Sequence, residues 1–203
     1  MPRLPVTDER KGNTVFILYT VSAEEVKNRD RLADEYISRM AEGDASAMGD
    51  LYELIKTDVY AYACSKLGRT PEAEDITHDT FVQIYQNAAL YTSHGKPLAW
   101  VFTVELNLIR RLKQKERNDI PLDELIESGE EGESLERSVE SVFVEQLLSK
   151  LGEDEREIVI LHAVSGLKHR EIAKLLSLPL STVLSRYNRA IKKLQAIAME
   201  EVN

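Results

Sequence analysis

The sequence predicts an all-α protein with two helical domains joined by a flexible acidic linker. Apolar residues recur at helical spacing through 30–117 and again through 139–203. Between these segments, residues 118–138 are dominated by acids and include one proline and two glycines. A chain of this composition repels itself and buries little apolar surface, so it should form an extended tether. The 203 residues are 43% hydrophobic, which is enough for two small cores.

Residues 1–29 form an N-terminal extension ahead of the first helical domain. The segment Val15–Tyr19 is β-prone, which favours either a short strand or a segment packed on the helical body. The extension is a candidate for an added regulatory or partner-contacting arm.

Four helices are expected in the first domain, separated by turn residues. Gly43, in a left-handed conformation, should end the first helix, and Asp44 should cap the second. Gly68 should end the second helix, and Thr70-Pro71 supplies an N-cap and a first-turn proline for the third. The polar segment 92–97 separates the third helix from the fourth.

Residues 161–194 show a helix-turn-helix pattern. Leu178-Pro179 stops one helix, because the residue before a proline is pushed out of the helical conformation. Ser181 and Thr182 can then accept hydrogen bonds from the first turn of a second helix. From Gly166 to Leu194 there are seven basic residues and one acid. Such a helix can place Ser, Arg and Asn against base edges and lysines against phosphates. Its candidate DNA-contacting residues are Ser181, Thr182, Ser185, Arg186, Asn188, Arg189 and Lys192.

A second basic cluster, from Arg110 to Arg117, lies at the end of the fourth helix. Cations there stabilise a helix C-terminus, and tryptophan is commonly a core residue, so a purely structural role for this cluster and Trp100 stays open. Basic residues near aromatic rings also suit single-stranded DNA, whose bases stack on the rings while its phosphates meet the cations.

The net charge of −9 does not exclude DNA binding, because the acids are concentrated in one segment. Asp119 to Glu145 holds ten acids and one base, so this segment alone carries the net charge of the whole chain. The remainder is neutral overall, with basic clusters at 110–117 and 168–193. We expect weak non-specific DNA binding by the free protein.

The second domain contains a recognisable series of residues: Arg156 to Leu161, Gly166, Glu171-Ile172-Ala173, Thr182-Val183, Ser185-Arg186 and Arg189-Ala190. This series resembles region 4 of bacterial RNA polymerase sigma factors. In the first domain, Glu74 to Phe81 resembles sigma region 2, and Pro97 to Val101 with Asn107 and Arg110-Arg111 resembles its adjoining part. Two such regions without a region 3 domain between them are typical of the extracytoplasmic-function (ECF) subgroup.

This resemblance implies a transcription initiation factor that is not an enzyme and needs no cofactor. Region 4 would recognise the −35 element as duplex, and region 2 would melt and bind the −10 element. The −10 candidates are Tyr91, His94, Lys96, Trp100, Asn107, Arg110, Arg111 and Lys113. The candidates for binding the β′ clamp helices of core polymerase are Asp75, Ile76, His78, Asp79, Phe81, Gln83 and Ile84. The implied partners are core RNA polymerase, including its β flap, promoter DNA and an anti-sigma factor.

The family also implies a role for the acidic linker, which passes through the active-site cleft and RNA exit path of the polymerase. Its carboxylates would then mimic nucleic-acid charge; they are Asp123, Glu124, Glu127, Glu130 and Glu131.

Two positions depart from the family pattern. His78 stands where glutamine is common, which affects the expected β′ contact. Ser177 stands where a glycine commonly ends the first helix of the DNA-binding pair. A serine held at positive φ would cost on the order of 1 kcal/mol.

Two other functions fit parts of the sequence. A conventional helix-turn-helix regulator would share the C-terminal motif, but it would need an effector domain that the first domain does not resemble. His78-Asp79 is the dipeptide of metal-dependent HD phosphohydrolases. Such a site needs an upstream histidine, and no histidine precedes His78.

The single cysteine, Cys64, excludes an intramolecular disulfide and a cysteine-based zinc site. No apolar run approaches the length of a membrane span, and the N-terminus lacks the pattern of a secretory signal. We therefore expect a cytoplasmic protein.

Overall fold

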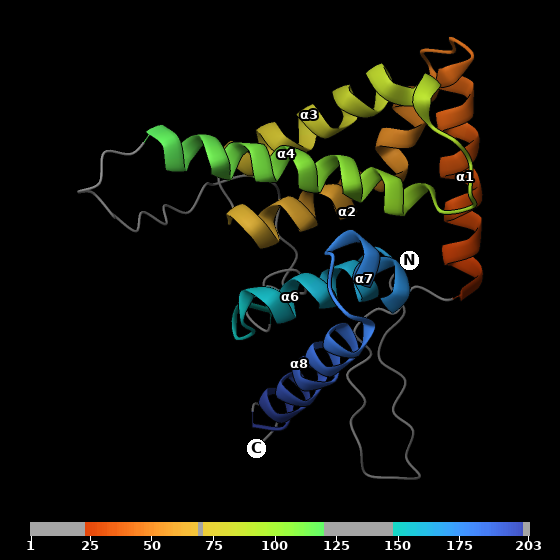
Figure 1. The fold of residues 1–203 in the computed structure, drawn as a ribbon. Coiled ribbons are helices and arrows are strands. Elements are labelled where there is room, and N and C mark those ends of the chain that lie inside the picture. Colours follow the sequence, from red (N-terminus) through yellow and green to blue (C-terminus); the bar gives the residue numbers. More distant parts are fainter. Residues whose placement is uncertain (1–22, 69–70, 120–147, 201–203) are drawn as a thin grey trace.

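The computed structural model describes residues 23–68, 71–119 and 148–200, and regular structure in these segments is entirely helical (Figure 1). This agrees with the predicted all-α class. The β-prone segment 15–19, the acidic residues 123–131 and the apolar residues Val142 and Phe143 lie outside the described residues.

The N-terminal helical group consists of α1 (Ala23–Ala41), α2 (Ala47–Leu67), α3 (Pro71–Asn87), the short 3-10 turn η1 (Ala88–Leu90) and α4 (Pro97–Asp119). Gly43 and Gly68 adopt φ values of 96° and 76°, and Gly68 donates a backbone hydrogen bond to Cys64 at the end of α2. Both predicted helix ends are therefore confirmed. Asp44 caps the helical turn that leads into α2, as predicted, because its carboxylate accepts the backbone N–H of Ser46 at 2.9 Å. The same carboxylate accepts a hydrogen bond from the Ser46 hydroxyl and pairs with Arg39 at 2.7 Å.

Helix α1 begins earlier than the apolar pattern predicted from Asp30. Its first turns are polar, with Glu24 and Glu25 placed favourably at the positive end of the helix dipole. Val26 from this part packs against the C-terminal half of the chain, a contact that local periodicity cannot reveal.

The C-terminal helical group contains α6 (Glu153–Val159), a π-helical turn η2 (Ile160–Val164), α7 (His169–Leu175) and α8 (Leu180–Glu200). Rings from three of these elements meet: His162 and His169 have centroids 4.1 Å apart, and Tyr187 of α8 contacts both edge-on. This cluster joins η2, α7 and α8, and it fixes the second helix of the helix-turn-helix against the rest of the group.

The turn between α7 and α8 is a Schellman motif with a serine at its left-handed position. Ser177 has φ 56°, the backbone N–H of Leu178 bonds to Ala173 at 2.9 Å, and that of Ser177 bonds to Lys174 at 3.2 Å. The positive φ predicted for Ser177 is confirmed.

Replacing Ser177 by glycine is therefore expected to stabilise the protein by about 0.5–1 kcal/mol, because glycine adopts this conformation without strain but loses more freedom on folding. Urea unfolding should show the gain. Ser177→Ala is the matched control, since it removes the hydroxyl but keeps the Cβ, and it should give no gain. Equal effects of the two substitutions would contradict the strain argument.

The two helical groups pack against one another through a continuous core. Tyr62 and Phe102 of the N-terminal group belong to the same buried cluster as Ile158, Leu161 and Ile172 of the C-terminal group. Figure 1 shows α6 and α7 lying along α2 and α4, while α8 points away from the N-terminal group. We call this packing of the two groups the closed arrangement.

Polar contacts reinforce the closed arrangement. Buried Tyr62 donates a hydrogen bond to Glu157 at 2.8 Å, and Lys66 pairs with Glu153 at 2.9 Å. Arg29 joins α1, α2 and the C-terminal group, because it pairs with Asp58 at 2.9 Å and donates to the Ser165 carbonyl at 2.9 Å. The sequence alone predicted neither the interface nor its partners.

Candidate nucleic-acid and polymerase interfaces

Helix α8 has one buried face and one polar face turned to solvent. Val183, Ala190 and Leu194 are buried against the other helices of the group. The opposite side carries polar residues, all exposed: Ser181, Ser185, Asn188 and Lys192. Because the second helix of a helix-turn-helix enters the major groove with its N-terminal residues against the bases, this side is the candidate DNA face.

The predicted capping role of Ser181 and Thr182 is wrong. The backbone carbonyl of Pro179 accepts the N–H groups of Thr182 at 3.0 Å and Val183 at 3.2 Å, and the helix starts at Leu180. Ser181 and Thr182 therefore lie inside the first turn. The Ser181 hydroxyl is exposed there, and the Thr182 side chain is half-buried at the edge of the DNA face.

Arg186 and Arg189 lie beside the DNA face and pair with acids of α6. Arg186 is 2.9 Å from Asp154, and its side chain is 28% exposed, whereas Arg189 is a looser 3.7 Å from Glu155. Lys193 pairs with buried Glu155 at 2.7 Å, and this hydrogen bond is the main reason why the pKa of Glu155 is lowered. These pairs hold α8 against α6. The pair with Asp154 therefore competes with any DNA contact that Arg186 would make.

Tyr91 and Trp100 of the predicted −10 site lie together, with ring centroids 4.9 Å apart. The Tyr91 hydroxyl donates to Asp34 at 2.5 Å, and Ser93 donates to the same carboxylate at 2.7 Å. Burial and the bond to Asp34 raise the pKa of Tyr91 above its usual range. The loop 91–96 is therefore anchored to α1, with both rings half-buried and His94 exposed at its tip.

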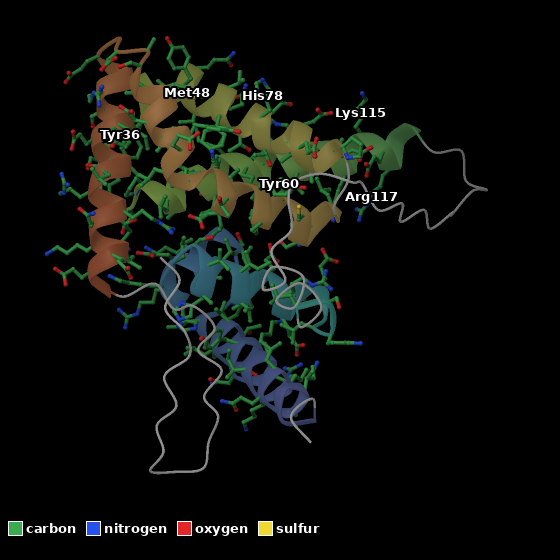
Figure 2. The ribbon with its side chains drawn as sticks, turned by 180° about the vertical axis from the view of Figure 1, so that it is seen from behind. Tyr36, Met48, Tyr60, His78, Lys115 and Arg117 are labelled. Atoms are coloured by element: carbon green, nitrogen blue, oxygen red, sulfur yellow. The ribbon has the colours of Figure 1, made fainter. Side chains whose placement is uncertain are left out.

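The polar residues of α4 divide between two sides of the helix. Asn107, Arg110 and Arg111 are exposed neighbours at helical spacing. Lys113 is half-buried and lies 3.7 Å from Glu153, and Lys96, just before the start of α4, pairs with Glu171 of α7 at 3.0 Å. Lys115 and Arg117 continue the basic cluster to the exposed end of the helix (Figure 2).

A pocket of about 390 Å³ lies between α4 and the C-terminal group, beside the core that joins them. Its charged lining residues are Lys66, Arg110, Lys113, Asp154, Glu157 and Arg186. The closed arrangement thus brings Arg110 and Lys113 of the predicted −10 set close to Arg186 of the predicted −35 set. Acids of α6 neutralise part of this positive charge.

The polymerase-binding residues predicted on α3 fall into two sets. Asp75, His78 and Asp79 are exposed and Gln83 is half-buried, and Figure 2 places His78 on the side of the protein away from α6–α8. Ile76, Phe81 and Ile84 are at most 6% exposed and belong to the core. The prediction that these three side chains contact polymerase directly is therefore corrected. Buried side chains cannot reach a partner, so they can only hold the exposed residues of α3 in position.

Within the described residues, His, Cys, Asp and Glu side chains form no group of three that could hold a metal ion. His78 and Asp79, the basis of the phosphohydrolase alternative, are both on the surface of α3. Among the described helices, none combines the length and apolar character that a bilayer crossing requires.

The chain matches family models of both conserved sigma regions. Residues 51–118 match Sigma-70 region 2, and residues 144–194 match Sigma-70, region 4. The ECF RNA polymerase sigma factor SigW of Bacillus subtilis (strain 168) is 26% identical over 174 residues, covering 78% of this chain and 92% of that protein. The ECF RNA polymerase sigma factor BldN of Streptomyces coelicolor is 27% identical over 174 residues, covering 82% of this chain and 66% of that protein.

Solved structures share the fold. CnrH in complex with the cytosolic domain of CnrY has a TM-score of 0.57 at 24% identity, covering 83% of this chain and 98% of that one. RpoE in complex with the anti-sigma factor NepR from Bartonella quintana has a TM-score of 0.61 at 24% identity, covering 74% and 96%. With both sigma regions matched in order, and with ECF sigma factors as relatives along most of its length, the chain belongs to the sigma-70 family of bacterial RNA polymerase sigma factors, in the ECF group.

Proposed function

We propose that this protein is a transcription initiation factor that binds core RNA polymerase and directs it to promoters. The observation that carries the proposal is the pairing of sigma regions 2 and 4 in one chain, in that order. Catalysis belongs to the polymerase in this proposal, so the protein is not an enzyme and needs no cofactor. It acts in the cytoplasm, where its DNA and polymerase partners are located.

The −35 element is bound as duplex by the exposed face of α8. Ser181, Ser185 and Asn188 supply hydrogen-bonding groups for base edges, and Lys192 supplies a cation for a phosphate. Arg189 joins this face from its edge, since its pair with Glu155 is long and 60% of its side chain is exposed. Thr182 and Arg186 flank the face, and Arg186 contributes after release from Asp154.

The −10 element is bound as single strand by the loop 91–96 and the outer side of α4. His94 at the loop tip and the edge of the Tyr91–Trp100 pair offer rings for an unstacked base. Asn107 and Arg111 face the strand from the outer side of α4, and Arg110 joins them from the edge of that side, where it also lines the pocket. Lys96 and Lys113 become available when their ion pairs with Glu171 and Glu153 open.

The exposed residues of α3 bind the β′ clamp helices, and the second domain binds the β flap. We expect Asp75→Arg to weaken binding to core polymerase about tenfold or more, because it places a like charge where a complementary one is needed. Fluorescence anisotropy with labelled protein measures this affinity. Glu35→Arg is the control, since Glu35 is also an exposed acid but lies on α1, where it has only an exposed pair with Arg31, and it should have little effect. Unchanged affinity of the Asp75 variant would remove α3 from the interface.

Simultaneous binding of both promoter elements requires the two helical groups to separate. The elements lie about 25 base pairs apart, or roughly 85 Å along the duplex. In the closed arrangement, by contrast, Lys113 of the −10 set and Arg186 of the −35 set line the same pocket. The closed arrangement therefore precedes the promoter complex, and its ion pairs, such as Lys96–Glu171, break when the complex forms.

An anti-sigma factor is a further proposed partner. RpoE from Bartonella quintana shares the fold of this chain, and its structure is that of a complex with the anti-sigma factor NepR. Such a partner would act by keeping the protein from core polymerase.

Footprinting with and without core polymerase tests the proposed function against that of a conventional regulator. With polymerase present, we expect protection around −35 and permanganate-reactive thymines around −10, which mark melted DNA. The protein alone should protect neither element, since its net charge is −9. Sequence-specific protection by the protein alone, with no melting when polymerase is added, would favour the conventional regulator instead.

A further inference from the structure

Leu184 is an exposed leucine at the edge of the polar face of α8, one residue after buried Val183. Four large hydrophobic side chains among the described residues are exposed, and Leu184 is one of them, at 39%. It lies three residues after Ser181 and four before Asn188, so both are its neighbours on the surface of α8, with half-buried Leu180 and Ile191 on its other side. An apolar side chain therefore lies beside the hydrogen-bonding groups proposed to meet the −35 bases.

The major groove offers one apolar group to such a side chain, the 5-methyl of thymine. The other base-edge groups in the groove are hydrogen-bond donors and acceptors, which a leucine cannot satisfy. We propose that Leu184 is a specificity-determining residue that selects thymine in the −35 element by packing against its methyl group. This inference rests on the proposed function, because it assumes that α8 enters the major groove at −35.

The surroundings of Leu184 favour a single base contact over a protein-binding patch. Its exposed neighbours Ser181 and Asn188 are polar and its apolar neighbours Leu180 and Ile191 are half-buried, whereas protein-binding patches are contiguous exposed apolar areas of several hundred Å². The nearby ring of Tyr187 is turned into the cluster with His162 and His169. On the described part of α8, Leu184 is thus the only large hydrophobic side chain that is exposed, and the apolar surface there is confined to one residue.

Single replacement of thymine by deoxyuridine tests the proposal, because it removes the methyl and keeps every hydrogen-bonding group. The protein, assembled with core polymerase, is tested on a series of promoters, each with one −35 thymine of either strand replaced. We expect one position, or two adjacent ones, to lose about fourfold in open-complex formation, the value of one buried methyl. With Leu184→Ala, thymine and deoxyuridine should be equivalent there.

Leu90→Ala is the matched control, since it truncates another exposed leucine, at 79% exposure, outside α8. It should keep the full response to deoxyuridine at −35. Thermal unfolding should show both variants folded, as neither side chain is in the core. A Leu184→Ala protein that still discriminates fourfold, or a wild-type protein indifferent to every replacement, would overturn the assignment while leaving initiation intact. Failure to initiate on any promoter would overturn the proposed function, and the assignment with it.

Discussion

A disulfide between positions 26 and 166 is expected to abolish promoter-directed initiation, and its reduction to restore it. A Cβ built at Gly166 would lie 3.7 Å from the Cβ of Val26, within the range that disulfides adopt. Val26 is on α1 and Gly166 follows η2, so the bond would lock the closed arrangement. If both promoter elements must be bound at once, the oxidised protein should initiate at least about a hundredfold less than the reduced protein.

The experiment uses Val26→Cys and Gly166→Cys together in a Cys64→Ser background, because Cys64 is the one native cysteine. Gly166 has φ 74°, so Gly166→Cys should cost on the order of 1 kcal/mol of stability. The Gly166→Cys single variant controls for that cost, and the Val26→Cys single variant controls for the change on α1. Neither should respond to oxidant or dithiothreitol. Equal run-off transcription from the oxidised and reduced double variant would show that the groups need not separate.

Replacing buried Glu105 by leucine is expected to stabilise the protein by roughly 1–3 kcal/mol at pH 7.5. Glu105 of α4 is 0% exposed, and neither carboxyl oxygen has a hydrogen-bond partner. The backbone of Ala63 lies near the Glu105 carboxyl and favours its charged form, although it does not meet the geometry of a hydrogen bond. Burial therefore dominates, with a contribution from Asp58, and raises the pKa of Glu105 well above its usual range.

The advantage of Glu105→Leu should grow with pH. The unfolded glutamate loses its proton near pH 4.5, whereas the folded protein holds it to a higher pH, so the wild type loses stability across that window. The limiting slope is about 1.4 kcal/mol per pH unit. Burial also raises the pKa of Asp58, to about 6, against the opposing effect of Arg29. Asp58 is present in both proteins, so subtracting their unfolding free energies leaves the titration of Glu105 together with its coupling to Asp58.

Urea unfolding from pH 5 to 8 measures this difference. Glu105→Gln serves as the control for charge alone: it should remove the pH dependence but give less stabilisation, because its amide also lacks partners in the core. If the difference in unfolding free energy between the wild type and Glu105→Leu stays constant from pH 5 to 8, the assignment of a raised pKa to Glu105 is contradicted.

Local features of the fold could be predicted from the sequence because each depends on a few adjacent residues. Gly43 and Gly68 end helices with positive φ, Pro71 begins α3, and Ser177 takes the left-handed position of its turn. The buried face of α8 followed from the spacing of Val183, Ala190 and Leu194. Backbone sterics and apolar periodicity determine these features without help from distant residues.

Contacts between distant segments could not be predicted in this way. The sequence pattern placed Arg186 among the DNA-contacting residues of its helix. In the structure it pairs with Asp154, which is remote in sequence. Tyr62–Glu157 and Lys96–Glu171 likewise join the two helical groups. The prediction of direct polymerase contact does not hold for the buried residues Ile76, Phe81 and Ile84. A family motif contains both surface residues and the core residues that support them, and the sequence pattern does not distinguish the two.

The measurement that tests the proposed initiation function most directly is a transcription assay on a genomic fragment library with purified bacterial core polymerase, with and without this protein. We expect discrete start sites that require both components, preceded by shared sequences near −35 and −10. An unchanged set of start sites on addition of active, folded protein that binds core polymerase would contradict that function.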